Sequence, residues 1–393
     1  MKLEYTPEQR AFRMEVRAWM EANVPDHALP SFDLTREGFE AHRDWERKLN
    51  EGRWGMVTWP VELGGRGLDL IRWLIFEEEY YRAGAPTRVN QNGIFLLGPT
   101  MMEFGTEEQK ARFLPRMAAG DDIWAQAWSE PGAGSDLAGV RSTATRDGDH
   151  YVLNGQKIWS SRATFADWAF GLFREPGSER HKGMSLVLFP LDAPGVTRRP
   201  IARMDGELVF AEIFLDNVRV PVADRLGEEG KGWHVCMATA GFERGLMLRS
   251  PARYQVAASK LIALYERHKD RMPASASASI AERVAKSWMD ADAYALAIYA
   301  MASRLAAGGT IGPEASTNKI FWSELDIALH QTALDILGDR AELMAPTAGA
   351  SNADDVDRWL DGYVFALPGP IYAGSNEIQR NIIAERMLGL PRG

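Results

Sequence analysis

The stretch Trp128-Ser129-Glu130-Pro131-Gly132-Ala133-Gly134-Ser135-Asp136 decides how we interpret this chain. It ends an apolar run that begins at Ile123. Glycine lets a backbone turn through positive φ and lets a ligand approach the main chain closely, and successive free N–H groups in such a turn form a concave anion site. A strand that ends here is therefore able to hold a phosphate-bearing cofactor. Taken alone, the stretch is explained more simply as a tight loop, so the rest of the chain must decide between the two.

The composition is that of a globular protein, with 393 residues of which 46% are hydrophobic and 25% charged. The net charge of −9 argues against nucleic acid as the main partner, because nucleic-acid binding needs a basic face. The single cysteine, Cys236, excludes an intrachain disulfide. Together with the lack of a secretory signal, it leads us to expect a cytoplasmic protein. No apolar run approaches the roughly 20 residues of a membrane span.

The hydrophobic periodicity changes twice along the chain and predicts three domains of the α+β class. Residues 1–122 have the pattern of helices, the first of which is capped by Thr6 and opens at Pro7. Residues 123–228 contain short β-rich runs, at a spacing typical of a compact barrel or sandwich. Residues 229–393 contain long apolar-periodic helices of the kind that pack as an antiparallel bundle.

Two local signals punctuate this pattern. Asn154-Gly155 is the kind of dipeptide that most strongly indicates a short hairpin turn. The segment from Ala274 to Ser279 contains only Ala and Ser, and we interpret it as a small linker between helices.

Several kinds of chemistry are not supported by any motif. The seven histidines show no HExxH or other tight ligand spacing, so we expect no protein-built metal site. No GxGxxG follows a strand, and GxxxxGK[ST] is absent, which argues against Rossmann and P-loop nucleotide binding. A GxSxG nucleophile elbow is absent as well.

Four stretches remain as candidates: Ser129 to Asp136, Lys157-Ile158-Trp159-Ser160-Ser161, Gly241-Phe242-Glu243-Arg244-Gly245, and Ile371-Tyr372-Ala373-Gly374-Ser375-Asn376-Glu377-Ile378-Gln379-Arg380. Each has a plainer explanation by itself. Trp159 suits a core, Glu243 and Arg244 suit an ion pair at a helix end, and Ser375 suits a helix cap.

In this order and at these separations, the four stretches resemble the acyl-CoA dehydrogenase family along nearly the whole chain. Further matching motifs are Trp59-Pro60 with Gly64-Gly65-Arg66-Gly67, Phe104-Gly105-Thr106, Phe113-Leu114-Pro115, Leu153-Asn154-Gly155-Gln156-Lys157-Ile158-Trp159 and Gly230-Lys231-Gly232-Trp233. The resemblance implies an N-terminal helical domain, a middle β-barrel and a C-terminal four-helix bundle. It also implies FAD bound between barrel and bundle, and a homo-oligomer that is a dimer or a tetramer.

The resemblance also implies roles for individual residues. Contacts to FAD fall on Trp128, Ser129, Ser135, Trp159, Ser161, Arg267, Ser375 and Glu377. Contacts to the acyl-CoA substrate fall on Ser135, Arg244, Ala373 and Gly374.

The reaction implied is α,β-desaturation of an acyl-CoA thioester, as in β-oxidation and lipid metabolism. A carboxylate removes the α-proton as general base, and the β-hydrogen leaves as hydride to flavin N5. The backbone N–H of Ala373 and a flavin ribityl hydroxyl stabilise the developing enolate oxygen. An electron-transfer flavoprotein is the implied electron acceptor.

The general base distinguishes this chain from many relatives, which carry a catalytic Glu where Ala373 stands here. A methyl group cannot accept a proton. Some relatives carry the Glu on the first bundle helix in a Glu-Arg pair, and this chain has Glu243-Arg244 there, so we assign Glu243 as the base. The alternative is that Glu243 pairs structurally with Arg244 and the chain is catalytically inactive.

Two stretches depart from the family pattern. Arg267-His268-Lys269-Asp270 has the Arg but not the Phe-Gly of an Arg-x-x-Phe-Gly motif. The segment Asp335 to Arg340 keeps one Gly of a Gln-x-x-Gly-Gly motif and lacks its Gln. Because both motifs bear on FAD binding across a subunit interface, a hetero-oligomer with a related chain is an alternative to the homo-oligomer.

Two other functions stay open. One is a flavin monooxygenase or nitroalkane-oxidase relative, against which Glu243 argues. The other is a non-catalytic subunit that supports an active partner.

Overall fold

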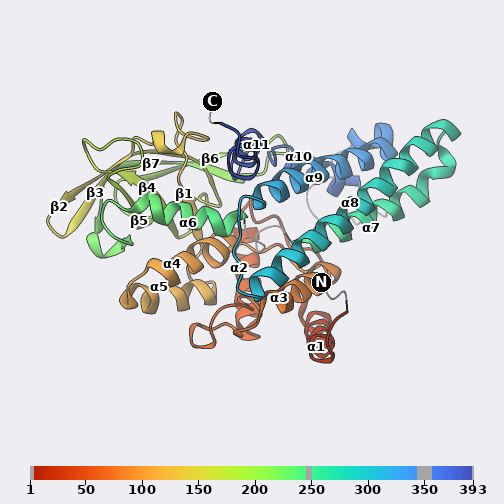
Figure 1. The fold of residues 1–393 in the computed structure, drawn as a ribbon, viewed down its shortest axis with the longest axis horizontal. Coiled ribbons are helices and arrows are strands. Elements are labelled where there is room, and N and C mark those ends of the chain that lie inside the picture. Colours follow the sequence, from red (N-terminus) through yellow and green to blue (C-terminus); the bar gives the residue numbers. More distant parts are fainter. Residues whose placement is uncertain (1–3, 245–249, 343–355, 392–393) are drawn as a thin grey trace. The chain divides into compact units, whose positions relative to one another are not determined.

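In the computed structural model, the described residues are 4–244, 250–342 and 356–391, with side chains except those of 242–244 and 356–358. They group into two compact units with interleaved sequence (Figure 1). The sheet unit comprises residues 25–68 and 86–243. The helical unit comprises residues 1–24, 69–85 and 244–393. The helices expected over residues 1–122 are present, and they are shared between the two units.

The helices of the sheet unit begin where the sequence supplies a cap. Thr35 accepts a hydrogen bond from the Gly38 N–H, and Thr106 forms a capping box with Gln109. The helix after Thr106 ends at Gly120, which has a φ of 74°. The helices of this unit are α2 (Arg36–Glu51), α4 (Gly98–Phe104), α5 (Glu107–Ala119) and α6 (Gly232–Arg244), with the π-helix Asn92–Leu97 and the 3₁₀ turns Val61–Leu63, Leu137–Gly139 and Val222–Asp224.

The strands form one sheet in the order β6-β7-β3-β2-β4-β5-β8, and β1 pairs in parallel with β4. Figure 1 shows these strands beside α4, α5 and α6 of the same unit. The core of the sheet unit is apolar and includes Tyr151, Leu153, Phe173 and Phe189, each fully buried. The strands are β1 (Trp124–Ala127), β2 (Thr143–Asp147), β3 (His150–Ser161), β4 (Trp168–Arg174), β5 (Met184–Pro190), β6 (Val196–Ile201), β7 (Phe210–Pro221) and β8 (Arg225–Leu226).

We expected a barrel, and the sheet is instead open. β6 and β8 end the strand order, and no pairing joins them among the described residues. One physical reason is the length of β8, which has two residues and pairs with β5 only at Leu186 and Val187. So short a strand cannot complete a ladder along β6.

The hairpin predicted at Asn154-Gly155 is wrong, because β3 runs straight through it. The Asn154 side chain bonds across the ladder to Asn217, with its Oδ1 2.9 Å from the Asn217 N–H. Gly155 has a φ of 140°, and a Cβ there would lie 2.2 Å from the Ser142 hydroxyl. The glycine thus serves a close approach of two strands, and the hairpin turn lies at Gly148, between β2 and β3.

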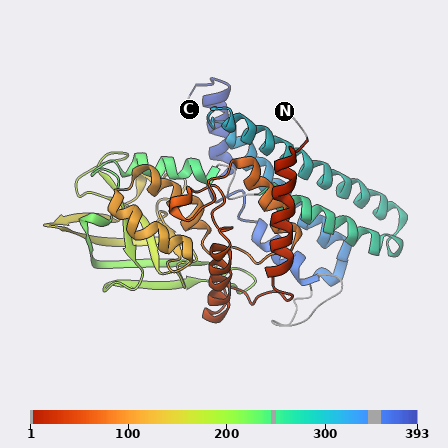
Figure 2. The ribbon, with the colours of Figure 1, turned by 90° about the horizontal axis from the view of Figure 1, so that it is seen from below.

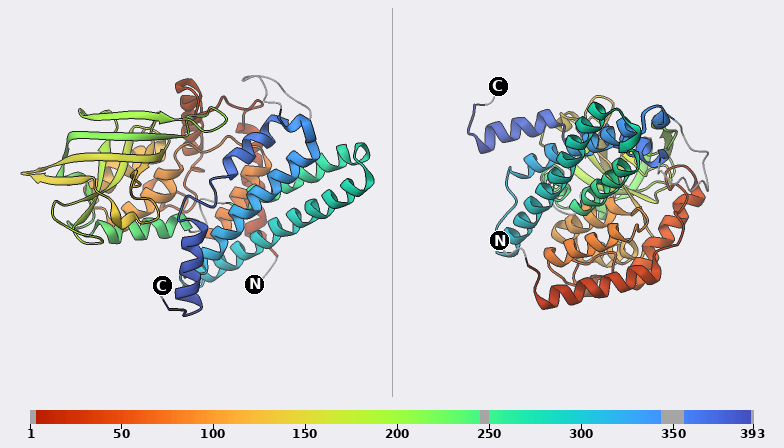
Figure 3. Two further views of the ribbon diagram at one scale, coloured as in Figure 1. Left: turned by 90° about the horizontal axis from the view of Figure 1, so that it is seen from above. Right: turned by 90° about the vertical axis from the view of Figure 1, so that its right-hand side faces the viewer.

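The helical unit packs α7, α8 and α9 against one another, and α9 also contacts α10 and α11. Figure 3 shows α7 and α8 running side by side. Helices from the N-terminal region join them, since α3 contacts α1, α7 and α8 (Figure 2), so the expected four-helix bundle is not the whole of this unit. Its helices are α1 (Pro7–Asn23), α3 (Leu70–Arg82), α7 (Pro251–His268), α8 (Ala274–Ala306), α9 (Ala315–Leu337), α10 (Val356–Ala366) and α11 (Asn376–Ile382), with the 3₁₀ segments Lys269–Arg271 and Gly338–Glu342 and the π-helix Ile383–Met387.

The linker predicted from Ala274 to Ser279 is wrong, because these residues form the first turns of α8. Pro273 stands at the N-cap of this helix, and alanine has the highest helix propensity of any residue. None of the helices in the described ranges is long and apolar enough to cross a membrane.

Glu79 joins α1 to α3 through a cluster of arginines. Its carboxylate is 1% exposed and accepts hydrogen bonds from Arg17 at 2.9 Å and from Arg82 at 2.7 Å, with Arg13 at 3.3 Å. Burial raises the pKa of Glu79, but the hydrogen bonds and charges of Arg17 and Arg82 outweigh burial and hold this pKa below its ordinary value. The cluster therefore stabilises the fold above the ordinary Glu pKa of 4.5 and loses that effect as the pH falls through the lower folded-state pKa.

We predict that Glu79→Gln lowers the free energy of unfolding at pH 7 by about 1–3 kcal/mol, because charged hydrogen bonds to three arginines are lost. The difference from the wild type should shrink near pH 3, where the wild-type carboxylate is itself protonated. Urea denaturation at both pH values measures this. Glu21→Gln is the control, because that side chain is 63% exposed and lies 3.5 Å from Arg82. Equal stability of Glu79→Gln and wild type at pH 7 would contradict the prediction.

Candidate functional site

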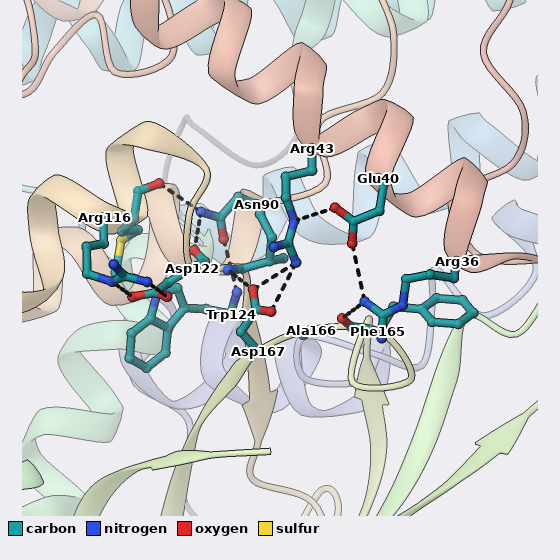
Figure 4. Close-up of polar contacts among 12 residues, drawn as sticks. Arg36, Glu40, Arg43, Asn90, Arg116, Asp122, Trp124, Phe165, Ala166 and Asp167 are labelled. Carbon is teal, nitrogen blue, oxygen red and sulfur yellow. Dashed lines mark hydrogen bonds and ion pairs between the residues drawn. The ribbon is translucent and has the colours of Figure 1, made fainter. Parts of the chain in front are cut away.

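The start of β1 is fixed by polar side chains, one buried and one half-buried (Figure 4). Asn90 is fully buried, and its Oδ1 accepts the Trp124 N–H at 3.1 Å. Asp167 accepts the Ile123 N–H at 2.8 Å and binds Arg43 of α2 at 2.9 Å. These contacts fix the first residues of β1, the strand that leads into the turn at residues 128–136.

The turn after β1 is closed by its own backbone. The Glu130 N–H donates to the Ala133 carbonyl at 2.9 Å, and the Ala133 N–H donates back to Glu130 at 3.0 Å. These two N–H groups are thus not free for an anion. Neither Gly132 nor Gly134 has a positive φ, and a Cβ at either would meet no atom within 4 Å. The glycines leave open space above the turn, which suits the approach of a ligand.

A buried ion pair lies beneath this turn. The Lys157 side chain is fully buried, and its Nζ lies 2.7 Å from Glu130 Oε1 and 2.5 Å from the Leu172 carbonyl. The Glu130 carboxylate also accepts the backbone N–H groups of Arg141 at 2.6 Å and Ser142 at 2.9 Å. Burial raises the pKa of Glu130, but the Lys157 charge and these hydrogen bonds outweigh burial and lower it. Burial lowers the pKa of Lys157, and the Glu130 charge and hydrogen bond oppose this effect. The pair ties the turn to β3, β4 and the segment before β2.

Trp159 stands on a bulge in β3. Two residues of β3, Ile158 and Trp159, lie opposite the single residue Glu212 of β7, between the pairs Lys157–Ile213 and Ser160–Ala211. Trp159 has a φ of 59° and is 57% exposed. The centroids of the Trp159 and Phe210 rings lie 5.8 Å apart in a T-shaped arrangement, and more than half of the Trp159 side chain stays accessible.

The other residues that we expected here differ in exposure. Trp128 is 7% exposed, Ser129 and Ser161 are half-buried, and Ser135 is exposed. The indole Nε1 of Trp128 and the Oγ of Ser160 are buried with no hydrogen-bond partner in the described part of the chain. Because buried polar atoms are normally paired, an acceptor atom of a bound molecule would satisfy the Trp128 Nε1–H, whereas Ser160 lies on the buried face of β3.

The loop before α11 has an unusual backbone. Ala373 has a φ of 56°, and Gly374 follows with a φ of 79°. A non-glycine residue in this region costs roughly 1–2 kcal/mol, so its surroundings must hold it. Gln379 is fully buried, and its Nε2 donates to the carbonyls of Ala373 at 3.2 Å and Gly374 at 3.1 Å.

Two further groups fix the same loop. Ser375 caps α11 by accepting the Ile378 N–H. Asn376 is buried, its N–H donates to the Pro370 carbonyl, and its Oδ1 accepts from Lys319 of α9 at 2.8 Å. Glu377 is exposed, and its position in the first turn of α11 places a negative charge where the helix dipole favours it. Ser375 is thus confirmed as a cap, which leaves its flavin contact a prediction.

The remaining predicted residues lie on helices. Glu243 and Arg244 are the last residues of α6, and their side chains lie outside the described residues, so the assignment of Glu243 as base stays a prediction. Arg267 is exposed in the last turn of α7. The Asp335 carboxylate of α9 forms an ion pair with Arg283 of α8 at 2.6 Å and accepts a hydrogen bond from Gln331 at 3.0 Å.

The sequence interpretation missed the residues that hold these segments in place. Lys157, Glu130 and Gln379 occur in the candidate stretches, but the sequence predicted no role for them. A signal for Lys157 was available, because it occupies an inward position in the alternation of β3 that Tyr151 and Leu153 also follow. A lysine at such a position needs a buried partner.

Family models match the chain over most of its length. Acyl-CoA dehydrogenase N-terminal, middle and C-terminal domains match residues 6–121, 125–218 and 230–388. The chain is 40% identical over 388 residues to acyl-CoA dehydrogenase IpdE1 of Mycobacterium tuberculosis, covering 97% of each chain. It is 34% identical to acyl-CoA dehydrogenase FadE26 of the same organism, covering 100% of this chain and 99% of that one.

Solved structures agree with these matches. The ChsE4-ChsE5 complex from Mycobacterium tuberculosis contains a chain with a TM-score of 0.82 and 33% identity, with full coverage of both chains. The Tcur3481-Tcur3483 steroid ACAD contains one with a TM-score of 0.84 and 28% identity, also with full coverage. The order of a helical, a β and a second helical region, the three family matches and these identities lead to one conclusion: the chain belongs to the acyl-CoA dehydrogenase family, whose members are flavin-dependent oxidoreductases that act on CH–CH bonds.

Proposed function

We propose that this protein binds FAD and introduces an α,β double bond into an acyl-CoA thioester, with Glu243 as the general base. The proposal of Glu243 as base depends on which residues stand at two positions of the chain. The position where many relatives place the catalytic Glu holds Ala373, and a Glu is present at the end of α6. The domain boundaries near residues 122 and 228 belong to the same proposal.

The residues of the sheet unit fit a flavin in their chemistry. Trp159 offers an exposed indole for stacking, Ser129 and Ser161 offer hydroxyl groups, and the turn at Gly132 leaves room for close approach. The buried Trp128 Nε1 lacks the acceptor that a polar atom of a cofactor would supply. When bound, FAD would supply the acceptor for the hydrogen that leaves the β-carbon. Ser135 is proposed on the pyrophosphate or CoA side.

In the helical unit, the proposal assigns FAD contacts to Arg267, Ser375 and Glu377 and substrate contacts to Arg244, Ala373 and Gly374. The N–H of Ala373 would donate to the thioester oxygen as negative charge develops there. Gln379 supports this role indirectly, because it donates to the carbonyls of Ala373 and Gly374 and so restricts the two peptides that follow the Ala373 N–H. Glu243 would take the α-proton, and an apolar surrounding would raise its pKa toward that of an effective base.

The chain is proposed to act within an oligomer. Two structural relatives are complexes named for two proteins, ChsE4-ChsE5 and Tcur3481-Tcur3483. Asp335 is already paired with Arg283, and the Phe-Gly of the family motif does not follow Arg267. Both observations support a role for a second, related chain in binding FAD. Measuring FAD per chain in the protein purified alone tests this, and full occupancy in a homo-oligomer would remove the need for a partner.

The acyl group and the electron acceptor are tested together. Anaerobic bleaching of the flavin should be measured with short, long, branched and steroid-derived acyl-CoAs, followed by reoxidation with an electron-transfer flavoprotein. Bleaching by at least one thioester supports the dehydrogenase. Rapid reoxidation of the reduced flavin by air would favour an oxidase or monooxygenase instead, and a lack of bleaching with every thioester would favour a non-catalytic subunit.

We predict that Glu243→Gln keeps the bound flavin and slows desaturation by about 10²–10⁴-fold, the usual contribution of a positioned general base. Stopped-flow bleaching with the best thioester from the panel measures the loss. The control is Glu228→Gln, which changes an exposed carboxylate before α6. Turnover of Glu243→Gln close to the wild-type rate would show that another group takes the proton.

We also predict that Gln379→Leu lowers the free energy of unfolding by about 1–3 kcal/mol, because two carbonyls lose their shared donor. Amide exchange of residues 371–376 should accelerate in this variant. Gln331→Leu on α9 is the control, because it removes an exposed hydrogen bond to Asp335. Unchanged exchange of the loop would mean that Gln379 does not hold it.

A further inference from the structure

The inner and outer faces of β3 are exchanged at its C-terminal end. Tyr151, Leu153 and Lys157 are buried at positions of the same parity. Continued alternation would place Trp159 on that inner face as well. The extra residue between Lys157 and Ser160 reverses the parity, so that Ser160 is fully buried and Trp159 is exposed.

The bulge is bonded to the turn after β1. Ile158 is not one of the paired residues in the register with β7, and its N–H donates to the Ser129 carbonyl at 2.9 Å. One hydrogen bond therefore joins the backbone of the turn to that of the bulge, and a displacement of either segment would strain it.

The Lys157 ammonium fixes both partners of that bond. Its three protons match three acceptors: Glu130 Oε1 at 2.7 Å, the Leu172 carbonyl at 2.5 Å and the Trp128 carbonyl at 3.4 Å. Two of these acceptors flank Ser129, and the lysine itself precedes Ile158. The Phe173 ring, with its centroid 4.9 Å from Nζ, closes the remaining side.

We infer that Lys157, held by Glu130, is a positioning residue that sets the β3 bulge and thereby presents the Trp159 indole and the Ser129 turn together. Its value for flavin binding rests on the proposed function, in which Trp159 and Ser129 contact the cofactor. The positioning itself is a property of the polypeptide and is testable without the flavin.

The test separates position from stability by comparing two variants. Lys157→Met leaves the Glu130 carboxylate buried without its ammonium, and we expect a lower melting temperature. The double variant Lys157→Met with Glu130→Gln removes that buried charge, so part of the stability should return. Both variants lack the bonds of the ammonium to the Trp128 and Leu172 carbonyls, so we expect the bulge to be displaced in both of them.

The position of Trp159 is read by ¹⁹F NMR of apoprotein labelled with 5-fluorotryptophan. The chain has 13 tryptophans, and Trp159→Phe identifies the resonance of interest by its disappearance. We expect that resonance to shift in both Lys157 variants. Arg112→Met is the matched control, because it removes the 2.6 Å partner of Asp224, a carboxylate that is 2% exposed in the 3₁₀ turn after β7, and should leave the resonance in place.

Flavin binding supplies the second readout. We expect the double variant to bind FAD about tenfold more weakly, as for the loss of one good contact, with a changed visible spectrum of the bound flavin. A shifted resonance with unchanged FAD affinity and spectrum would leave the positioning role standing and refute the contact between Trp159 and flavin. A wild-type resonance in the double variant would overturn the inference, since Lys157 would then contribute only stability.

Discussion

The ion pair between Lys157 and Glu130 is the interaction on which the arrangement of the sheet unit depends. A lysine ammonium without water is costly to bury, and here Glu130 and two backbone carbonyls replace its hydration shell. Glu130 also binds the backbone before β2. One pair of charges thus joins the turn after β1 to β2, β3 and β4. A buried pair is weak evidence for stability, but it fixes register, because its charges tolerate few alternative positions.

The helical unit solves a similar problem with different groups. The left-handed backbone at Ala373 and Gly374 is held by the amide of Gln379, and Asn376 is held by Lys319. The Glu79 cluster joins two helices at a point distant in sequence from this loop. In each unit a turn carries some of the candidate contacts, and a buried side chain on a regular element binds it: Lys157 of β3 binds the turn after β1, and Gln379 of α11 binds the loop at Ala373. This division is expected, because a turn presents its backbone freely and needs rigid support to keep one conformation.

Much of the fold followed from local sequence. Thr6, Thr35 and Thr106 each cap a helix by a hydrogen bond to a backbone N–H three residues later, and the change to short β-rich runs after residue 122 located the sheet. Failures came where a contact across strands decided the outcome. Asn154-Gly155 has the composition of a turn, yet it lies inside a strand, where Asn154 bonds to Asn217 and the glycine allows a close approach to Ser142. The open edge of the sheet likewise depends on the two-residue length of β8, which no periodicity indicates.

The sequence by itself determined the family, the order of helical and β regions, and the absence of a carboxylate at Ala373, since each depends on which residues occur and in what order. The tertiary structure decided that Trp159 faces outward, that Ser160 is buried, and that Glu130 is bound to Lys157. The physical reason is the bulge in β3. One additional residue exchanges the two faces of a strand, and it persists because a hydrogen bond and an ion pair from distant segments hold it there.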